Sequence, residues 1–195
     1  MTVDPIAALL EVVRILEELN LPYAIGGSVA SSVFGEPRAS ADADLIVEIA
    51  ESQVSELVAK MEQTFYISED AARDAVRLRS SFNVIHLESM YKVDMFVAGP
   101  DLLDREQLRR REEIVIARDP ECRAYVTSAE NVVLRKLDWY RAGGEVSDQQ
   151  WRDVLGVLKV QGSAIDRGYL ADVARRVALS HLLARALREA GLDES

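Results

Sequence analysis

Two periodicities of apolar and polar positions divide this chain into predicted helices and strands. From Asp4-Pro5 to Leu19 the apolar side chains recur every three or four positions, which predicts a helix with the aspartate as its cap and the proline in its first turn. The run Tyr23–Ile25 predicts a short buried strand, Gly26-Gly27 a tight turn, and residues 28–34 a short helix that begins at a serine. Helix and strand therefore alternate from the start of the sequence.

The same alternation continues through the middle of the chain. Residues 42–49 are mostly β-branched or apolar and predict a central strand, and the amphipathic stretch 52–63 follows it as a helix. Residues 82–87 and 91–97 predict an antiparallel pair, and residues 113–117 predict one more strand. We therefore expect a mixed sheet with helices, of the α/β or α+β class.

Beyond Pro120 the pattern predicts helices alone, with glycine-containing breaks between them. The expected helices span residues 128–142, 147–161, 166–179 and 180–190. We accordingly expect two parts, a core at residues 1–120 and a C-terminal helical region at residues 121–195.

The composition indicates a folded protein with an acidic surface. The 195 residues are 49% hydrophobic, and the net charge of −10 disfavours nucleic acid and anionic membranes as partners except where basic residues gather, as between Arg105 and Arg111. Acids are interleaved there, so a self-paired helix face and a nucleic-acid site are both open. The single cysteine, Cys122, excludes an intrachain disulfide and indicates a reducing compartment. With no signal sequence or membrane-spanning apolar stretch, a cytoplasmic protein without a membrane partner is expected.

Three aspartates occupy positions where folding would bring carboxylates together. Asp42 and Asp44 begin the predicted central strand two residues apart, so both side chains point to the same face. Asp94 lies in the apolar run 91–97, where a lone charge is costly to bury. Oxygen ligands of this kind suit Mg²⁺, and two such ions about 4 Å apart can clamp the attacking and leaving oxygens in phosphoryl chemistry. The alternative is a pair of aspartates that simply face water on an exposed strand.

The turn Gly26-Gly27-Ser28 precedes these acids, at a point where a strand gives way to a helix. Free backbone N–H groups at a helix N-terminus form a site for phosphate, although the same glycines also suit an ordinary tight turn. A phosphate-binding turn, then paired carboxylates, then a third carboxylate in a later strand favours nucleotide chemistry.

In this order the residues resemble the motif of the nucleotidyltransferase superfamily with the polymerase beta-like fold. That motif is a Gly-Gly or Gly-Ser pair, Asp-x-Asp and a third strand carboxylate, which Gly27-Ser28, Asp42-Ala43-Asp44 and Asp94 match. The stretch 38–44 resembles the Arg-x-Thr-x-Asp-x-Asp form of the AbiEii-like abortive-infection group, with serine in place of threonine. Further stretches resemble that group's other motifs: Lys92-Val93-Asp94, Glu130, Lys136 and Arg152-Asp153.

The resemblance implies a metal-dependent nucleotidyltransferase that moves a nucleoside monophosphate from a nucleoside triphosphate to an acceptor and releases pyrophosphate. Its catalytic and metal-binding residues would be Asp42, Asp44 and Asp94, with two Mg²⁺ ions expected and Mn²⁺ as an alternative. Its nucleotide-binding residues would be Gly26, Gly27, Ser28, Arg38, Lys92 and Lys136. The acceptor would be a tRNA, a protein or a small molecule, and a cognate toxin or antitoxin is a further expected partner.

Several residues keep a second interpretation. Lys136 lies on an apolar helix stripe and either binds triphosphate or extends past its packed stem to water, with Asp153 as its expected partner. Arg38 either binds phosphate or is merely exposed. We expect structural roles for both histidines and core positions for Trp139, Tyr140 and Trp151. Because no P-loop, Rossmann, nucleophile-elbow or zincin motif is present, the competing hypotheses are a non-catalytic, antitoxin-like protein of the same fold and a structural α/β domain.

Overall fold

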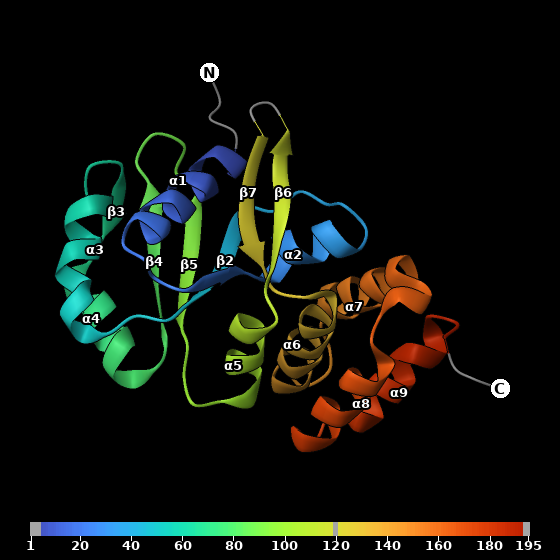
Figure 1. Cartoon of the computed structure of the whole chain (residues 1–195). Helices are drawn as coiled ribbons and strands as arrows, with labels where there is room; N and C mark the ends of the chain where they lie inside the picture. Colours follow the sequence, from blue (N-terminus) through green and yellow to red (C-terminus); the bar gives the residue numbers. More distant parts are fainter. Residues whose placement is uncertain (1–4, 119–120, 193–195) are drawn as a thin grey trace.

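One mixed sheet organises the protein (Figure 1). The computed structural model describes residues 5–118 and 121–192, and within these ranges seven strands follow the order β3-β4-β5-β2-β1-β7-β6. The strands are β1 (Tyr23–Ile25), β2 (Asp42–Val47), β3 (Phe65–Ile67), β4 (Ser81–His86), β5 (Lys92–Val97), β6 (Glu112–Arg118) and β7 (Glu121–Val126). The β2–β5 and β1–β7 pairs are parallel, and the other neighbouring strands are antiparallel.

Helices cover both faces of this sheet. They are α1 (Pro5–Glu18), α2 (Gly27–Phe34), α3 (Val54–Met61), α4 (Glu69–Leu78), α5 (Leu102–Arg109), α6 (Ala129–Ala142), α7 (Asp148–Gln161), α8 (Arg167–Arg176) and α9 (Ser180–Glu189), with 3₁₀ turns η1 (Glu51–Gln53) and η2 (Gly162–Ala164). Helices α1, α3 and α4 lie on one side, α2, α5 and α6 lie on the other, and α7, α8 and α9 pack beyond α6 (Figure 1). Within the described ranges, every helix is too short or too polar to cross a membrane.

Strand alternation decides which face of the sheet carries the acids. Ala43, Leu45 and Val47 on β2 are buried in the hydrophobic core, as are their partners on β5. Successive side chains of a strand point to opposite faces, so burying these residues forces Asp42 and Asp44 onto the other face. The core therefore fixes the direction of the carboxylates.

The helical region packs directly on α2, the helix that begins at the glycine turn. Gly35, just after α2, lies so close to α7 that a Cβ atom there would stand 2.8 Å from the backbone nitrogen of Val157. The Gln161 amide at the end of α7 donates a hydrogen bond to the carbonyl of Phe34 (2.8 Å). Side chains of α6 and α7 are thereby brought to the carboxylate face.

Most of the predicted elements are present in the structure, which also contains elements that the sequence pattern did not predict. The mixed sheet, the strand Tyr23–Ile25 and the antiparallel β4–β5 pair are confirmed. Strand β3 and helix α4 were not among the expected elements, whereas α5 coincides with most of the stretch 105–111, for which a helix face was one of the two interpretations. The expectation of helices alone beyond Pro120 is wrong for 121–126, because that polar segment forms β7 through pairing with β6 and β1. Pro120 and Asp4, the expected cap of α1, lie outside the described residues.

Candidate active site

The glycine turn lies directly against one of the carboxylates. Gly27 has a φ of 54°, in the left-handed region, and a Cβ atom added to it would stand 1.7 Å from Oδ2 of Asp44. The Gly26 backbone N–H donates to the Asp44 carbonyl (2.8 Å), which fixes the turn to β2. Both the backbone conformation and the close approach therefore require glycine at position 27.

A chain of hydroxyl groups joins the turn to the second carboxylate. Ser28 is 6% exposed, and its hydroxyl donates to Oγ of Ser40 (2.8 Å). The Ser40 hydroxyl donates in turn to Oδ1 of Asp42 (3.2 Å). Ser40, the residue that stands in place of threonine in the 38–44 stretch, thus links the first turn of α2 to the start of β2.

Parallel pairing of β2 with β5 brings the three aspartates to one face. Asp44 is the register partner of Asp94, and Asp42 is the partner of Lys92. Burial, followed by repulsion from Asp42 and then from Asp94, raises the pKa of Asp44 to about 6, although Lys136 and a backbone hydrogen bond from Ser28 oppose the shift. The site therefore holds more negative charge than its own cations compensate.

Lys92 is the cation nearest to the two outer carboxylates. Its Nζ lies 2.7 Å from Oδ2 of Asp94 and 3.7 Å from Oδ2 of Asp42. The hydrogen bond to Asp94, opposed by burial and supported by both negative charges, raises the pKa of Lys92. The ammonium group therefore stands between Asp42 and Asp94.

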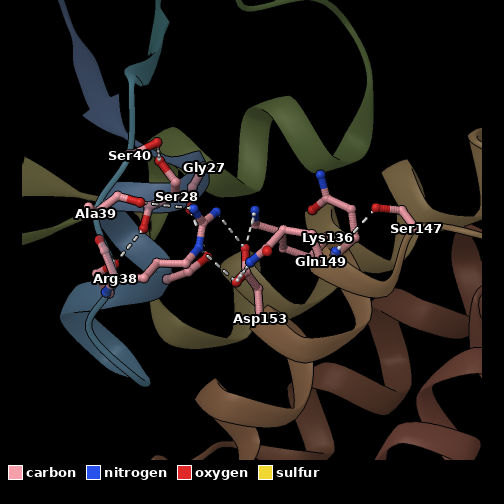
Figure 2. A network of polar contacts seen from close by, with 12 residues as sticks. Gly27, Ser28, Arg38, Ala39, Ser40, Lys136, Ser147, Gln149 and Asp153 are labelled. Atoms are coloured by element: carbon pink, nitrogen blue, oxygen red, sulfur yellow. Dashed lines mark hydrogen bonds and ion pairs between the residues drawn. The ribbon is translucent and has the colours of Figure 1, made fainter.

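A second cluster connects the loop before β2 to the helical region (Figure 2). Asp153 on α7 accepts two hydrogen bonds from the Arg38 guanidinium (both 3.1 Å) and one from Nζ of Lys136 on α6 (2.8 Å). The Gln149 amide donates to it as well (3.0 Å). Burial alone would raise the pKa of Asp153, but the two cations outweigh burial and lower it. The expected Lys136–Asp153 pair is confirmed.

This cluster also reaches the carboxylates. Lys136 is 3% exposed, so it is not a snorkelling lysine, and its charge lowers the pKa of Asp44. The Arg38 side chain keeps 32% of its surface exposed. Two cations from opposite sides of the site, one on a loop and one on α6, are therefore held by a single buried acid.

A small cavity is lined by the predicted site residues Gly26, Gly27 and Asp44 together with residues from β5, α5 and α6. It has a volume of about 50 Å³, and its walls include Phe96 on β5, Asp104 on α5, and Arg135 and Trp139 on α6. Trp139 lies 5.9 Å from the Phe96 ring and is outside the hydrophobic core, unlike its expected position. No local sequence signal marks these residues, because only the packing of α5 and α6 on β2 brings them together.

The remaining candidate residues have structural roles. Tyr140 and Trp151 are buried in the core as expected. His86 is buried, packs edge-on against Phe65, and has its Nδ1 2.8 Å from Oγ of Ser89. Glu130 is buried at a distance from the carboxylates and accepts a hydrogen bond from the backbone of Asp166 at the start of α8 (3.0 Å).

The carboxylate oxygens of Asp42, Asp44 and Asp94 are suitable ligands for a hard divalent cation, but the three side chains do not converge on a common point. Within the described parts of the chain, no group of three or more His, Cys, Asp or Glu side chains is assembled as a metal site. In this arrangement Lys92 lies between Asp94 and Asp42 as their counter-ion. The raised pKa of Asp44 is the observation that fits a cation, because burial and the repulsion from Asp42 and Asp94 both disfavour its ionised form and additional positive charge would favour it.

Comparisons with known proteins bear on the fold. No protein-family model matches the sequence, and no curated protein is a detectable relative. Among solved structures, the antibiotic-resistance factor ANT(2'')-Ia superposes with a TM-score of 0.59 at 14% identity, covering 97% of this chain and 98% of that one. An antigenic nucleotidyltransferase-like protein from Paracoccidioides brasiliensis gives a TM-score of 0.57 at 16% identity, covering 96% and 94%.

The lincosamide antibiotic adenylyltransferase LnuA gives a TM-score of 0.51 at 12% identity, covering 82% of this chain and 98% of that one. At these identities the likeness concerns the fold, and the AbiEii-like subgroup stays a prediction. The order of glycine turn, Asp-x-Asp strand and third aspartate strand, together with these superpositions, shows that the chain has the nucleotidyltransferase fold.

Proposed function

We propose that this protein transfers a nucleoside monophosphate from a nucleoside triphosphate to an acceptor and releases pyrophosphate. The observation that carries the proposal is the placement of Asp42, Asp44 and Asp94 on one face of β2 and β5, beside a turn that only glycine can form. The fold of the neighbouring structures, one of which is an adenylyltransferase, supports the same reaction class.

The turn and the surrounding cations would bind the triphosphate. Gly27 and Ser28 open α2, whose first-turn N–H groups suit phosphate oxygens. Arg38 and Lys136 would offset the phosphate charge from the side of the helical region, and Lys92 from β5. Asp153 would position both of the first two cations, since it already holds them where the triphosphate is expected.

Mg²⁺, with Mn²⁺ as the alternative, would be held by Asp42, Asp44 and Asp94. When bound, such ions would neutralise triphosphate charge and polarise the reacting phosphoryl oxygen. Asp94 would accept the proton of the acceptor hydroxyl, after exchanging its contact with Lys92. Asp44, whose pKa is raised to about 6 in the metal-free protein, would be held in its ionised form by the bound cation.

The test is nucleotide transfer with each labelled triphosphate, Mg²⁺ and fractionated cell extract as the source of acceptor. We expect pyrophosphate release and one labelled product, both lost in Asp44→Asn and unchanged in Asp70→Asn, which removes an exposed aspartate from α4. Labelling of an RNA, protein or small-molecule fraction would identify the acceptor class.

The competing function is that of a non-catalytic protein of the same fold. The contacts of Lys92 with Asp94 and Asp42 favour this alternative, because the lysine side chain occupies the place between the carboxylates where a metal ion would bind. Such a protein would act by binding a cognate toxin or antitoxin. No pyrophosphate release with any triphosphate, together with recovery of one stoichiometric protein partner, would replace the proposed reaction with this function.

A further inference from the structure

We propose that a groove lined by arginines, on the opposite side of α5 from Asp44, binds the phosphodiester backbone of a single-stranded nucleic acid. Arg79, Arg105, Arg109 and Arg111 line this groove together with the single acid Glu48, and its volume is about 800 Å³. The chain has a net charge of −10, so this cluster of arginines gives the groove a positive potential on an otherwise acidic surface. The proposal concerns binding and stands whether or not the chain transfers nucleotides.

Helix α5 separates the groove from the candidate active site. Asp104 and Gln107, three positions apart, line the cavity next to Asp44. Arg105 and Arg109, four positions apart, line the groove. Arg105 and Arg109 come one and two positions after Asp104 and Gln107, and side chains so spaced do not face each other on a helix. The two hollows adjoin at Asp104, whose carboxylate accepts a hydrogen bond from the Gly99 N–H in the groove wall (2.9 Å), but the arginines line only the groove.

Three of the four arginines have no acidic partner. Among the described residues, no carboxylate forms an ion pair with Arg79, Arg105 or Arg111, whereas Arg109 pairs with Glu106. Arg79 donates only to the carbonyl of Ala98 (3.1 Å), and Arg111 to that of Leu108 (3.0 Å). Many other arginines of this chain contact carboxylates, as Arg38, Arg73 and Arg135 do. Among the described residues, Arg118, Arg152, Lys159 and Arg188 also form no ion pair, but only in this groove do three such arginines line one hollow.

One of these arginines also has an unsatisfied donor. The Nε atom of Arg111 is buried and has no hydrogen-bond partner among the described residues. The guanidinium also stacks on the Tyr125 ring, 4.8 Å from its centroid, so a ligand oxygen would reach this buried Nε only if the side chain turned. Phosphate oxygens are the acceptors that a guanidinium matches best in geometry.

The rest of the lining favours a nucleic-acid strand over inorganic polyphosphate. Between the arginines, the groove is lined by the apolar residues Ala98, Pro100 and Leu108. Sugars and unstacked bases of a single strand gain from such contacts, whereas a fully charged polyphosphate chain does not. Glu48 would also repel the denser charge of polyphosphate more strongly.

The test is fluorescence anisotropy of a labelled 20-nucleotide single-stranded RNA with the full chain, without Mg²⁺ or triphosphate, over a salt series. Three phosphate contacts predict a slope of log K against log salt of about −2. Arg105→Glu, at an exposed residue without a partner, is expected to weaken binding about tenfold or more and to flatten the slope. Arg79→Gln removes the charge of a groove arginine that lies outside α5, and it should weaken binding as well.

The matched control is Arg14→Glu on α1, which changes net charge equally at a side chain that is 69% exposed. Equal weakening by Arg14→Glu and Arg105→Glu would overturn the proposal, because binding would then follow net charge alone. Absence of RNA binding at low salt, or tighter binding of polyphosphate than of RNA with the same dependence on Arg105, would also overturn it. Loss of RNA binding in Asp42→Asn but not in Arg105→Glu would place the RNA at the carboxylates instead.

Discussion

Replacing Asp44 by asparagine should stabilise the metal-free protein while it removes a catalytic carboxylate. In the folded chain the pKa of Asp44 lies at about 6, against a usual value of 3.8, because the side chain is buried and faces Asp42 and Asp94. The ionised form is therefore less favourable in the folded state than in the unfolded state. An asparagine has nearly the same shape, fits against Gly27 in the same way and carries no charge.

The two pKa values set the size and the pH window of the effect. The values of about 6 and 3.8 differ by about two units, and at about 1.36 kcal/mol per unit ionised Asp44 costs roughly 3 kcal/mol. This cost is fully present above the folded pKa and disappears below the unfolded one, so the wild-type protein loses stability as the pH rises between 3.8 and 6. Asp44→Asn lacks this loss and should melt about 6–12 °C higher at pH 8.

The assay is urea and thermal unfolding in the presence of a chelator at several pH values, followed by tryptophan fluorescence. Asp153→Asn is the control of opposite sign, because the pKa of Asp153 is lowered and its charge stabilises the fold above the usual value of 3.8. That variant should lose about 3 kcal/mol at pH 8 and approach the wild type in acid. The reasoning is refuted if Asp44→Asn is less stable than the wild type at pH 8, or if its difference from the wild type does not change with pH.

Further outcomes can be measured with the same unfolding and binding assays. Mg²⁺ should raise the melting temperature of the wild type but not that of Asp42→Asn/Asp44→Asn, and an equal shift in both would contradict the assigned ligands. Gly27→Ala should lose about 2–4 kcal/mol in urea unfolding, because the new methyl group meets Asp44 in a left-handed backbone conformation; a wild-type midpoint would disprove that contact. Lys136→Met should raise the pKa of Asp153 and weaken triphosphate binding in calorimetry, and unchanged affinity would remove Lys136 from the nucleotide site. Leu137→Ala, at a fully buried core residue, should cost about 2–5 kcal/mol without changing the pH profile of stability, which separates packing from charge.

The arrangement of charges around Asp44 explains why its site should be weakly stable without a ligand. Lys92 neutralises part of the charge of Asp94 and Asp42, whereas Lys136 is already engaged with Asp153. Asp44 is buried, is repelled by Asp42 and Asp94, and is compensated only in part by Lys136, so its pKa is raised. The ionised Asp44 is expected to lower the stability of the metal-free fold while it serves the reaction, as is usual where like charges lie together in an active site.

Local patterns in the sequence were sufficient for the elements that form the site. The short strand before Gly26, the helix after it and the aspartate strand each have a period and a turn signal of their own, and the structure has all of them. The pattern failed where an element depends on distant partners. Strand β7 is polar along much of its length and forms only because β6 and β1 supply hydrogen bonds. By contrast, α4 has a serine cap at Ser68 and an amphipathic pattern, so the signal for it was present in the sequence.

The sequence by itself determined that Asp42 and Asp44 share one face of their strand, because the alternation of side chains along a strand depends only on local geometry. Only the tertiary structure decided that Asp94 joins them, that Lys92 stands between Asp94 and Asp42, and that Asp153 holds Arg38 and Lys136 together. Strand register and helix packing are set by the burial of many apolar side chains at once. No short segment of the sequence contains all of these apolar contacts. The contacts between distant residues therefore form only when the whole core is assembled.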